Sequence, residues 1–121
     1  MFDHIYKSPM VWGENAWMFL HCVTYTYPNE PSLEDQKQYK TFMTSLQHVL
    51  PCPTCRRHYR EYLLEHSIEP SLVSQKKFVQ YVMKLHNHIN TKMKQKQSQT
   101  LEQCKNLFEN RCIQQYLRNS S

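Results

Sequence analysis

QKKFVQYVMKLHNHINTKM, residues 75–93, carries the clearest structural signal in the chain. Its apolar side chains recur every three or four residues, at Phe78, Val82, Leu85, Ile89 and Met93. This spacing places them on one face of an α-helix. Ser74 precedes the stretch and is a suitable N-cap, because its hydroxyl oxygen can accept a hydrogen bond from a free N–H of the first turn. The sequence therefore predicts a helix over residues 75–93 with one buried face.

Helical spacing also appears on both sides of this stretch, between the prolines of the chain. The expected helices cover residues 14–25, 33–49 with Ser32 as N-cap, a segment that starts at Cys52–Pro53, and residues 100–117. Proline is favoured at a first helical position, because its missing N–H would have no partner there. No segment alternates with a period of two. We expect an all-α fold, a four-helix bundle plus a fifth helix, in one domain over residues 1–121.

The composition limits what the protein can bind. Gly13 is the single glycine, so the chain lacks the glycine-rich loops of Rossmann folds and P-loops. A nucleotide would have to be held by side chains and helix faces. The net charge of +5 allows an anionic cofactor, but the lysines are mostly spread out and we expect no nucleic-acid binding.

The N-terminal residues suggest no targeting segment. They lack a basic start followed by a long apolar stretch, so we expect no signal peptide. The longest apolar run, Ala16–Leu20, is far too short to span a bilayer, and we expect no membrane insertion. These features leave the compartment open.

LPCPTCRRH, residues 50–58, is the main chemical signal. Cys52 lies at the start of an expected helix, where free N–H groups and the helix dipole stabilise a thiolate. Arg56 and Arg57 add positive charge, and CxxC spacing allows a disulfide. A thioredoxin-like enzyme would need a βαβ pattern, which is absent. The alternative is a zinc-stabilised helical interaction module on Cys52, Cys55 and His58, which ranks lower because it lacks a second ligand pair.

Three blocks in order resemble the Erv/ALR family of FAD-linked sulfhydryl oxidases. They are WGENAWMFLHCVTYTYP (12–28), LPCPTC (50–55) and LHNHINTKM (85–93). They are similar to the family's Gly-x-x-x-Trp-x-x-x-His segment, its proline-preceded CxxC and its His-Asn-x-Val-Asn-x-Lys stretch. The resemblance implies a four-helix bundle that cradles FAD, with a short fifth helix, commonly as a homodimer.

The resemblance also implies residue roles. Cys52 and Cys55 would be catalytic, with Cys55 facing the isoalloxazine ring and Cys52 meeting the substrate. The FAD site would use Trp12, Gly13, Trp17, His21, either Tyr25 or Tyr27, His86, Asn87, Asn90 and Lys92. The spacing is compatible with this, because the two pairs Trp17/His21 and His86/Asn90 are each four residues apart and share a helix face.

The chain departs from the family pattern near its C-terminal end. Met83 and Thr100 stand where many members have a structural disulfide, so we expect that cross-link to be missing. The late tryptophan often found beside the adenine is also absent, and Phe108 is a weak candidate for its stacking role.

Cys104 and Cys112 are the other candidate redox residues, as a shuttle that relays electrons. Eight residues apart on one helix, their Cα atoms would lie roughly 12 Å apart, too far for a disulfide. They can be free, be linked between subunits, or one can pair with Cys22; equally, they can be small buried hydrophobes. The chain therefore resembles minimal family members, including those of large DNA viruses, which use a separate redox partner.

The resulting hypothesis is a dithiol oxidase. A protein dithiol substrate, or a thioredoxin-like relay protein, attacks the Cys52–Cys55 disulfide at Cys52. Cys55 then passes two electrons to FAD, and molecular oxygen is reduced to hydrogen peroxide. If the chain is viral, the host cytoplasm or the virion would be its place of action.

Overall fold

The computed structural model describes residues 2–93 and 99–120, and these residues form helices and no strand. The helices are α1 (Asp3–Lys7), α2 (Pro9–Tyr25), α3 (Leu33–Val49), α4 (Pro53–Glu65), the 3₁₀ helix η1 (Glu69–Val73), α5 (Gln75–Lys92) and α6 (Leu101–Asn119). The expected all-α fold, with a four-helix bundle and an additional C-terminal helix, is confirmed.

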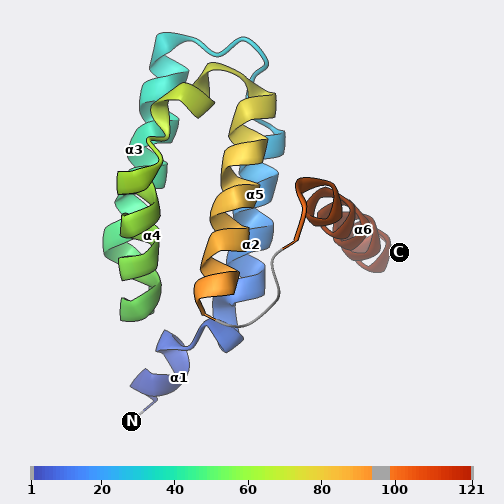
Figure 1. Cartoon of the computed structure of the whole chain (residues 1–121). Helices are drawn as coiled ribbons and strands as arrows, with labels where there is room; N and C mark the ends of the chain where they lie inside the picture. Colours follow the sequence, from blue (N-terminus) through green and yellow to red (C-terminus); the bar gives the residue numbers. More distant parts are fainter. Residues whose placement is uncertain (1, 94–98, 121) are drawn as a thin grey trace.

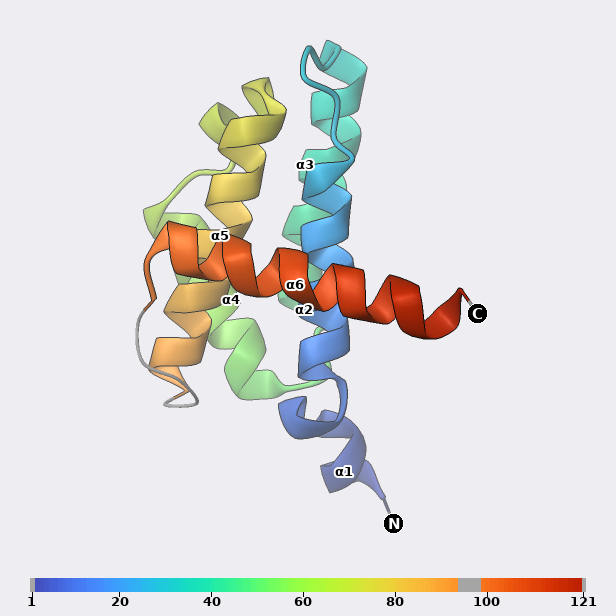
Figure 2. The same ribbon diagram turned by 90° about the vertical axis from the view of Figure 1, so that its right-hand side faces the viewer.

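The bundle consists of two helix pairs. Helix α2 packs beside α5, and α3 packs beside α4 (Figure 1). Helix η1 joins α4 to α5 at one end of the bundle, where it contacts α3 and α5. Helix α1 extends beyond the opposite end, and α6 lies crosswise over α5 and α2 (Figure 2). The sixth helix thus covers one outer face of the bundle instead of joining it.

Side chains at the helix starts explain where the helices begin. The Ser32 hydroxyl accepts a hydrogen bond from the Asp35 N–H at 2.9 Å, and the Asp35 carboxylate accepts one from the Ser32 N–H. Ser74 caps α5 in the same manner. Cys52 is the N-cap of α4, with Pro53 at the first helical position. The predicted starts of these three helices are confirmed.

Helix α5 forms the centre of the hydrophobic core. Phe78, Val82 and Leu85 are completely buried, and Ile89 is nearly so. Tyr81 of α5 is also part of the core. The remaining core side chains come from the other bundle helices, η1 and nearby loops: Leu20, Tyr27, Met43, Tyr59, Tyr62, Ile68 and Leu72. Burial of side chains of this size contributes about 1.5–3 kcal/mol each. The core therefore fixes the orientation of α5 and of the polar residues that border its buried face.

The N-terminal region differs from the expectation. Helix α2 begins at Pro9 instead of near residue 14, because Pro9 occupies its first position and the Ser8 hydroxyl accepts a hydrogen bond from the Met10 N–H. Met10 and Val11 in this first turn are exposed, so no buried stripe marks the turn in the sequence. Helix α6, with 19 residues, agrees closely with the expected range of residues 100–117 and is longer than the short fifth helix that the family resemblance implies. Within residues 2–93 and 99–120, none of the helices combines the length and apolarity needed to cross a bilayer.

Candidate functional site

The CxxC pair lies at the start of α4. Cys52 caps the helix, and its sulfur accepts a hydrogen bond from the Cys55 N–H at 3.1 Å. Both side chains are buried, with 7% and 5% of their surface exposed. The Arg56 guanidinium donates a hydrogen bond to the Leu50 carbonyl and so ties the helix start to the preceding turn. The predicted position of the pair at a helix N-terminus is confirmed.

The two cysteines have different electrostatic surroundings. Burial raises the pKa of the Cys55 thiol to about 12, and the hydrogen bond and proximity to Cys52 act in the same direction. Cys55 therefore keeps its proton at neutral pH when the pair is reduced. The sulfur of Cys52, in contrast, accepts a hydrogen bond from the backbone N–H of Cys55 at the N-terminus of α4.

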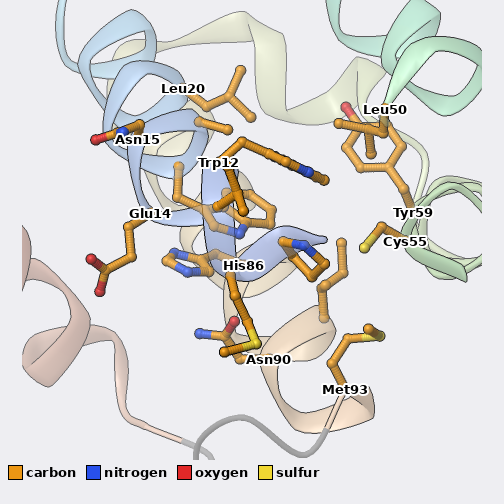
Figure 3. A pocket seen from close by; sticks show the side chains of 17 residues that line it. Trp12, Glu14, Asn15, Leu20, Leu50, Cys55, Tyr59, His86, Asn90 and Met93 are labelled. Atoms are coloured by element: carbon orange, nitrogen blue, oxygen red, sulfur yellow. The ribbon is translucent and has the colours of Figure 1, made fainter. Parts of the chain in front are cut away.

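A cavity of about 560 Å³ lies beside Cys55 (Figure 3). Helices α2, α4 and α5 provide its walls together with the turn before α4. Figure 3 shows Cys55 and Tyr59 on one side of this cavity, with Trp12 and His86 toward the other. Its lining residues are Pro9 to Trp17, Leu20, Leu50, Cys55, Tyr59, His86, Ile89, Asn90 and Met93. Its size is in the range of cofactor sites, and its mixture of apolar, aromatic and amide side chains suits a flat ring with polar edges.

An aromatic cluster between α2 and α5 forms one wall. The rings of Trp17 and His86 are stacked with centroids 4.1 Å apart and an interplanar angle of 11°. The Nε2 atom of His21 lies 2.9 Å from Nδ1 of His86 in a hydrogen bond. Burial lowers the pKa of His21 to about 4, so this histidine is neutral at physiological pH. The cluster is therefore an aromatic surface that contains a neutral His21 and a hydrogen bond between the two histidine rings.

Three buried polar atoms on α2 have no hydrogen-bond partner within residues 2–93 and 99–120. They are Nε1 of Trp12, Nδ1 of His21 and the hydroxyl of Tyr25. Buried polar groups in native proteins are nearly always hydrogen-bonded, so each such atom needs an explanation. A bound molecule with polar edges would supply partners for atoms placed in this way.

A second cavity, of about 60 Å³, lies where α6 crosses the bundle. It shares His86 and Asn90 with the larger cavity, so the two are neighbours along α5. Its other lining residues are Met18, His21, Asn87, Gln99, Cys104, Leu107, Phe108 and Arg111. The residues that line the two cavities extend from Cys55 to α6 and could contact one long ligand.

Most of the predicted site residues are brought together. Trp12, Gly13 and Trp17 line the large cavity, His21 and Asn87 the small one, and His86 and Asn90 both. Tyr25 stacks on Phe108 with centroids 4.9 Å apart.

Two predicted residues lie elsewhere. Tyr27 is buried in the core, where its hydroxyl donates a hydrogen bond to the Leu72 carbonyl at 2.7 Å. Lys92 is exposed at the last position of α5 and lines neither cavity. Of the two tyrosine alternatives, Tyr25 also lines neither cavity, but it contacts Phe108, which lines the small one.

The structure adds residues that the sequence reasoning missed. Tyr59 lines the large cavity beside Cys55. It follows Cys55 by four residues, so the two share a helix face, and this spacing in the sequence could have indicated its position. Arg111 lines the small cavity and pairs with Glu14 at 3.5 Å. No local pattern indicates Arg111, because its place depends on how α6 crosses α2.

The zinc alternative finds no support in the side-chain geometry. In the part of the chain that the structure describes, no three His, Cys, Asp or Glu side chains are grouped as metal ligands would be. The nearest ionic partner of His58 is Glu61, with Nδ1 and the carboxylate oxygen 3.8 Å apart.

Comparisons with known proteins agree with this geometry. The chain is 36% identical over 84 residues to the probable FAD-linked sulfhydryl oxidase R368 of Acanthamoeba polyphaga mimivirus, covering 69% of this chain and 59% of that protein. It is 33% identical over 78 residues to the FAD-linked sulfhydryl oxidase ERV1 of Arabidopsis thaliana, covering 64% and 40%. The chain thus spans about half the length of these two relatives.

The fold has solved counterparts. The crystal structure of the yeast Erv1 core superposes with a TM-score of 0.72 at 25% identity, and the match covers 86% of this chain and 82% of that one. The family model for Erv1/Alr matches residues 14–112, a range that holds the CxxC pair, the small cavity and most residues of the large cavity. The chain belongs to the Erv1/Alr family.

Proposed function

We propose that this chain, acting as one domain over residues 1–121, is an FAD-dependent sulfhydryl oxidase whose redox pair is Cys52 and Cys55. The observation that carries the proposal is the position of Cys55, which lines a large aromatic cavity while its partner does not. A redox pair with one thiol beside a cofactor-sized cavity can pass electrons from a dithiol substrate to a cofactor bound there. The names of the curated relatives, FAD-linked sulfhydryl oxidases, support the same activity.

The residues present fit FAD. The large cavity has aromatic walls and the unpartnered Trp12 nitrogen, and the small cavity has that of His21; a flavin ring with polar edges would use such atoms. Asn90, shared by both cavities, is suited to the middle of a long ligand. Arg111 beside the small cavity can offset phosphate charge, a role that the sequence suggested for Lys92. When bound, FAD supplies the two-electron chemistry that links a dithiol to oxygen, with hydrogen peroxide as the product.

Thiol–disulfide exchange assigns separate tasks to the two cysteines. A substrate thiolate attacks Cys52 of the oxidised pair, a substrate–Cys52 bond forms, and Cys55 leaves. The second substrate thiol then displaces Cys52, which leaves as a thiolate. The Cys55 N–H and the N-terminus of α4 stabilise that negative charge. Cys52 is the outer residue in this scheme because Cys55 lines the cavity.

The proposed partners are a protein dithiol, or a thioredoxin-like relay protein, and a second copy of the chain. An exposed aromatic pair supports dimerisation: Phe19 of α2 and Phe42 of α3 are in edge contact at the surface, with centroids 6.4 Å apart. Charge at this position should disrupt the dimer. Light scattering on Phe19→Asp tests this, with Leu64→Asp, which alters an exposed leucine on α4, as the control.

Cysteine substitution tests the redox assignment. Cys52→Ser and Cys55→Ser should each reduce oxygen consumption with dithiothreitol by at least about a hundredfold, because neither variant can form the disulfide that accepts the electron pair. Thr54→Ser, which alters an exposed residue between the two cysteines and keeps both thiols, is the matched control and should retain activity. Near-normal turnover in either Cys52→Ser or Cys55→Ser would refute the assignment.

A further inference from the structure

Two cysteines outside the CxxC pair meet where α6 crosses α2. Cys22 on α2 and Cys112 on α6 lie close enough for their thiols to interact. Cys22 is exposed and Cys112 is half-buried. They lie 90 positions apart in sequence, so their contact is created by the fold.

Aromatic packing holds the two helices together at this point. The ring of Phe108 lies 5.2 Å from that of His21 and is stacked on that of Tyr25 at 4.9 Å. His21 and Tyr25 flank Cys22 on α2, while Phe108 is one turn before Cys112 on the same face of α6. Arg111 adds an ion pair to Glu14. The packed helix crossing therefore holds Cys22 and Cys112 near one another.

We propose that Cys22 and Cys112 form a disulfide that fastens α6 over the bundle. Phe108 is the single buried side chain of α6, so the helix has few other attachments to the bundle. The cross-link would keep Phe108 and Arg111 in place beside the small cavity. It is distinct from the redox pair, because neither cysteine lines the large cavity.

The local environment suits this reaction. Burial and the neighbouring Cys22 raise the pKa of Cys112, as expected for a half-buried thiol beside another sulfur. Cys22, the exposed member, attacks an external disulfide, breaks its S–S bond and forms a mixed disulfide while one thiol leaves. Cys112 then displaces the second half. The S–S bond now joins Cys22 and Cys112, and the external disulfide has taken up the electron pair and both protons as two thiols.

The consequence concerns cofactor retention, and this part rests on the proposed function. A cross-link that closes a loop of about 90 residues removes much of the freedom of the unfolded chain. It also prevents α6 from swinging away from the cavities. The oxidised form should therefore melt at a higher temperature and release FAD several-fold more slowly than the form in which Cys22 and Cys112 are reduced.

Peptide mapping tests the cross-link directly. The full-length protein, loaded with FAD, is treated with oxidised glutathione, alkylated and digested without reduction. We expect a peptide pair that joins Cys22 to Cys112 and disappears after reduction. Separate alkylation of the two residues, glutathione on each of them, or a cross-link that uses Cys104 would overturn the proposal. This readout does not depend on oxidase activity, so it stands even if no flavin binds.

Melting temperatures supply the second measurement. In a Cys52→Ser/Cys55→Ser background, treatment with oxidised glutathione should raise Tm by about 5 °C or more. Adding Cys22→Ser or Cys112→Ser should abolish the shift, whereas adding Cys104→Ser should preserve it. An equal shift without Cys22 would overturn the proposal. A shift in Tm without slower release of FAD from the oxidised wild-type protein would overturn the part that concerns the cofactor.

Discussion

Burial keeps His21 neutral, and this has a consequence for stability against acid. Its pKa is lowered to about 4 in the folded protein, whereas an exposed histidine in the unfolded chain titrates near 6.5. Between these values the unfolded chain binds a proton that the folded chain does not. The free energy of unfolding should therefore fall as the pH decreases from about 6.5 to 4, by about 3 kcal/mol in total from this residue.

Urea unfolding of variants between pH 7 and pH 4 measures this contribution. His21→Gln should show a flatter dependence of stability on pH than the wild type. His48→Gln, which changes an exposed histidine on α3, should behave like the wild type. An unchanged slope in His21→Gln would mean that another group is responsible.

Substitution of Tyr27 tests whether this residue stabilises the core or contacts the cofactor. Its hydroxyl bonds the Leu72 carbonyl in the core, so Tyr27→Phe leaves a buried acceptor unsatisfied. The free energy of unfolding should decrease by about 1–3 kcal/mol, with little change in FAD affinity. Denaturant unfolding and flavin titration check both effects. Tyr39→Phe, in the same ring cluster with centroids 4.7 Å apart, is the control. A large loss of FAD affinity in Tyr27→Phe would place this residue at the site after all.

Asn87 connects two helices as well as lining the small cavity. Its amide donates a hydrogen bond to the Gln99 carbonyl at 2.9 Å and accepts one from the Gln99 N–H at 3.0 Å. These bonds fix the chain just before α6 against α5. Asn87→Ala should loosen α6, and amide hydrogen exchange in α6 should accelerate about tenfold or more. Thr91→Ala, one turn further along α5, should leave exchange in α6 near the wild-type rate.

The bundle helices could be predicted because their signals are local. The stripe from Phe78 to Met93 follows one helix face, and Ser32, Ser74 and Cys52 satisfy free N–H groups of the turns that they begin. The first turn of α2 was not predicted, because its apolar residues Met10 and Val11 are exposed and do not continue the buried stripe of the helix.

Site residues could be predicted where they share a helix face or fall within a block that resembles the family. Trp17 and His86 lie on two separate helices, each within a block that resembles the family, and they meet in a stack. Arg111 and the Cys22–Cys112 contact depend on the way in which α6 crosses the bundle. Such a crossing is a tertiary property with no local sequence pattern.

The large cavity joins helices that are separate in sequence. Its walls come from α2, α4 and α5, so a ligand in it would bind the folded chain and not the unfolded one. FAD should therefore raise Tm in a concentration-dependent manner, by an amount equivalent to about 2.7 kcal/mol at one hundred times its Kd. Thermal melts across an FAD titration, with riboflavin as a comparison ligand that lacks the adenine nucleotide, check this expectation. A Tm independent of FAD would show that the cavity does not hold it.

The visible absorbance spectrum of the purified protein, recorded before and after dithiothreitol is added in air, tests the proposed oxidase most directly. We predict a yellow protein with a bound-flavin band that bleaches when oxygen is exhausted and returns on aeration, while oxygen is consumed together with the thiol. A protein that is colourless and stays colourless after incubation with FAD would contradict the proposal.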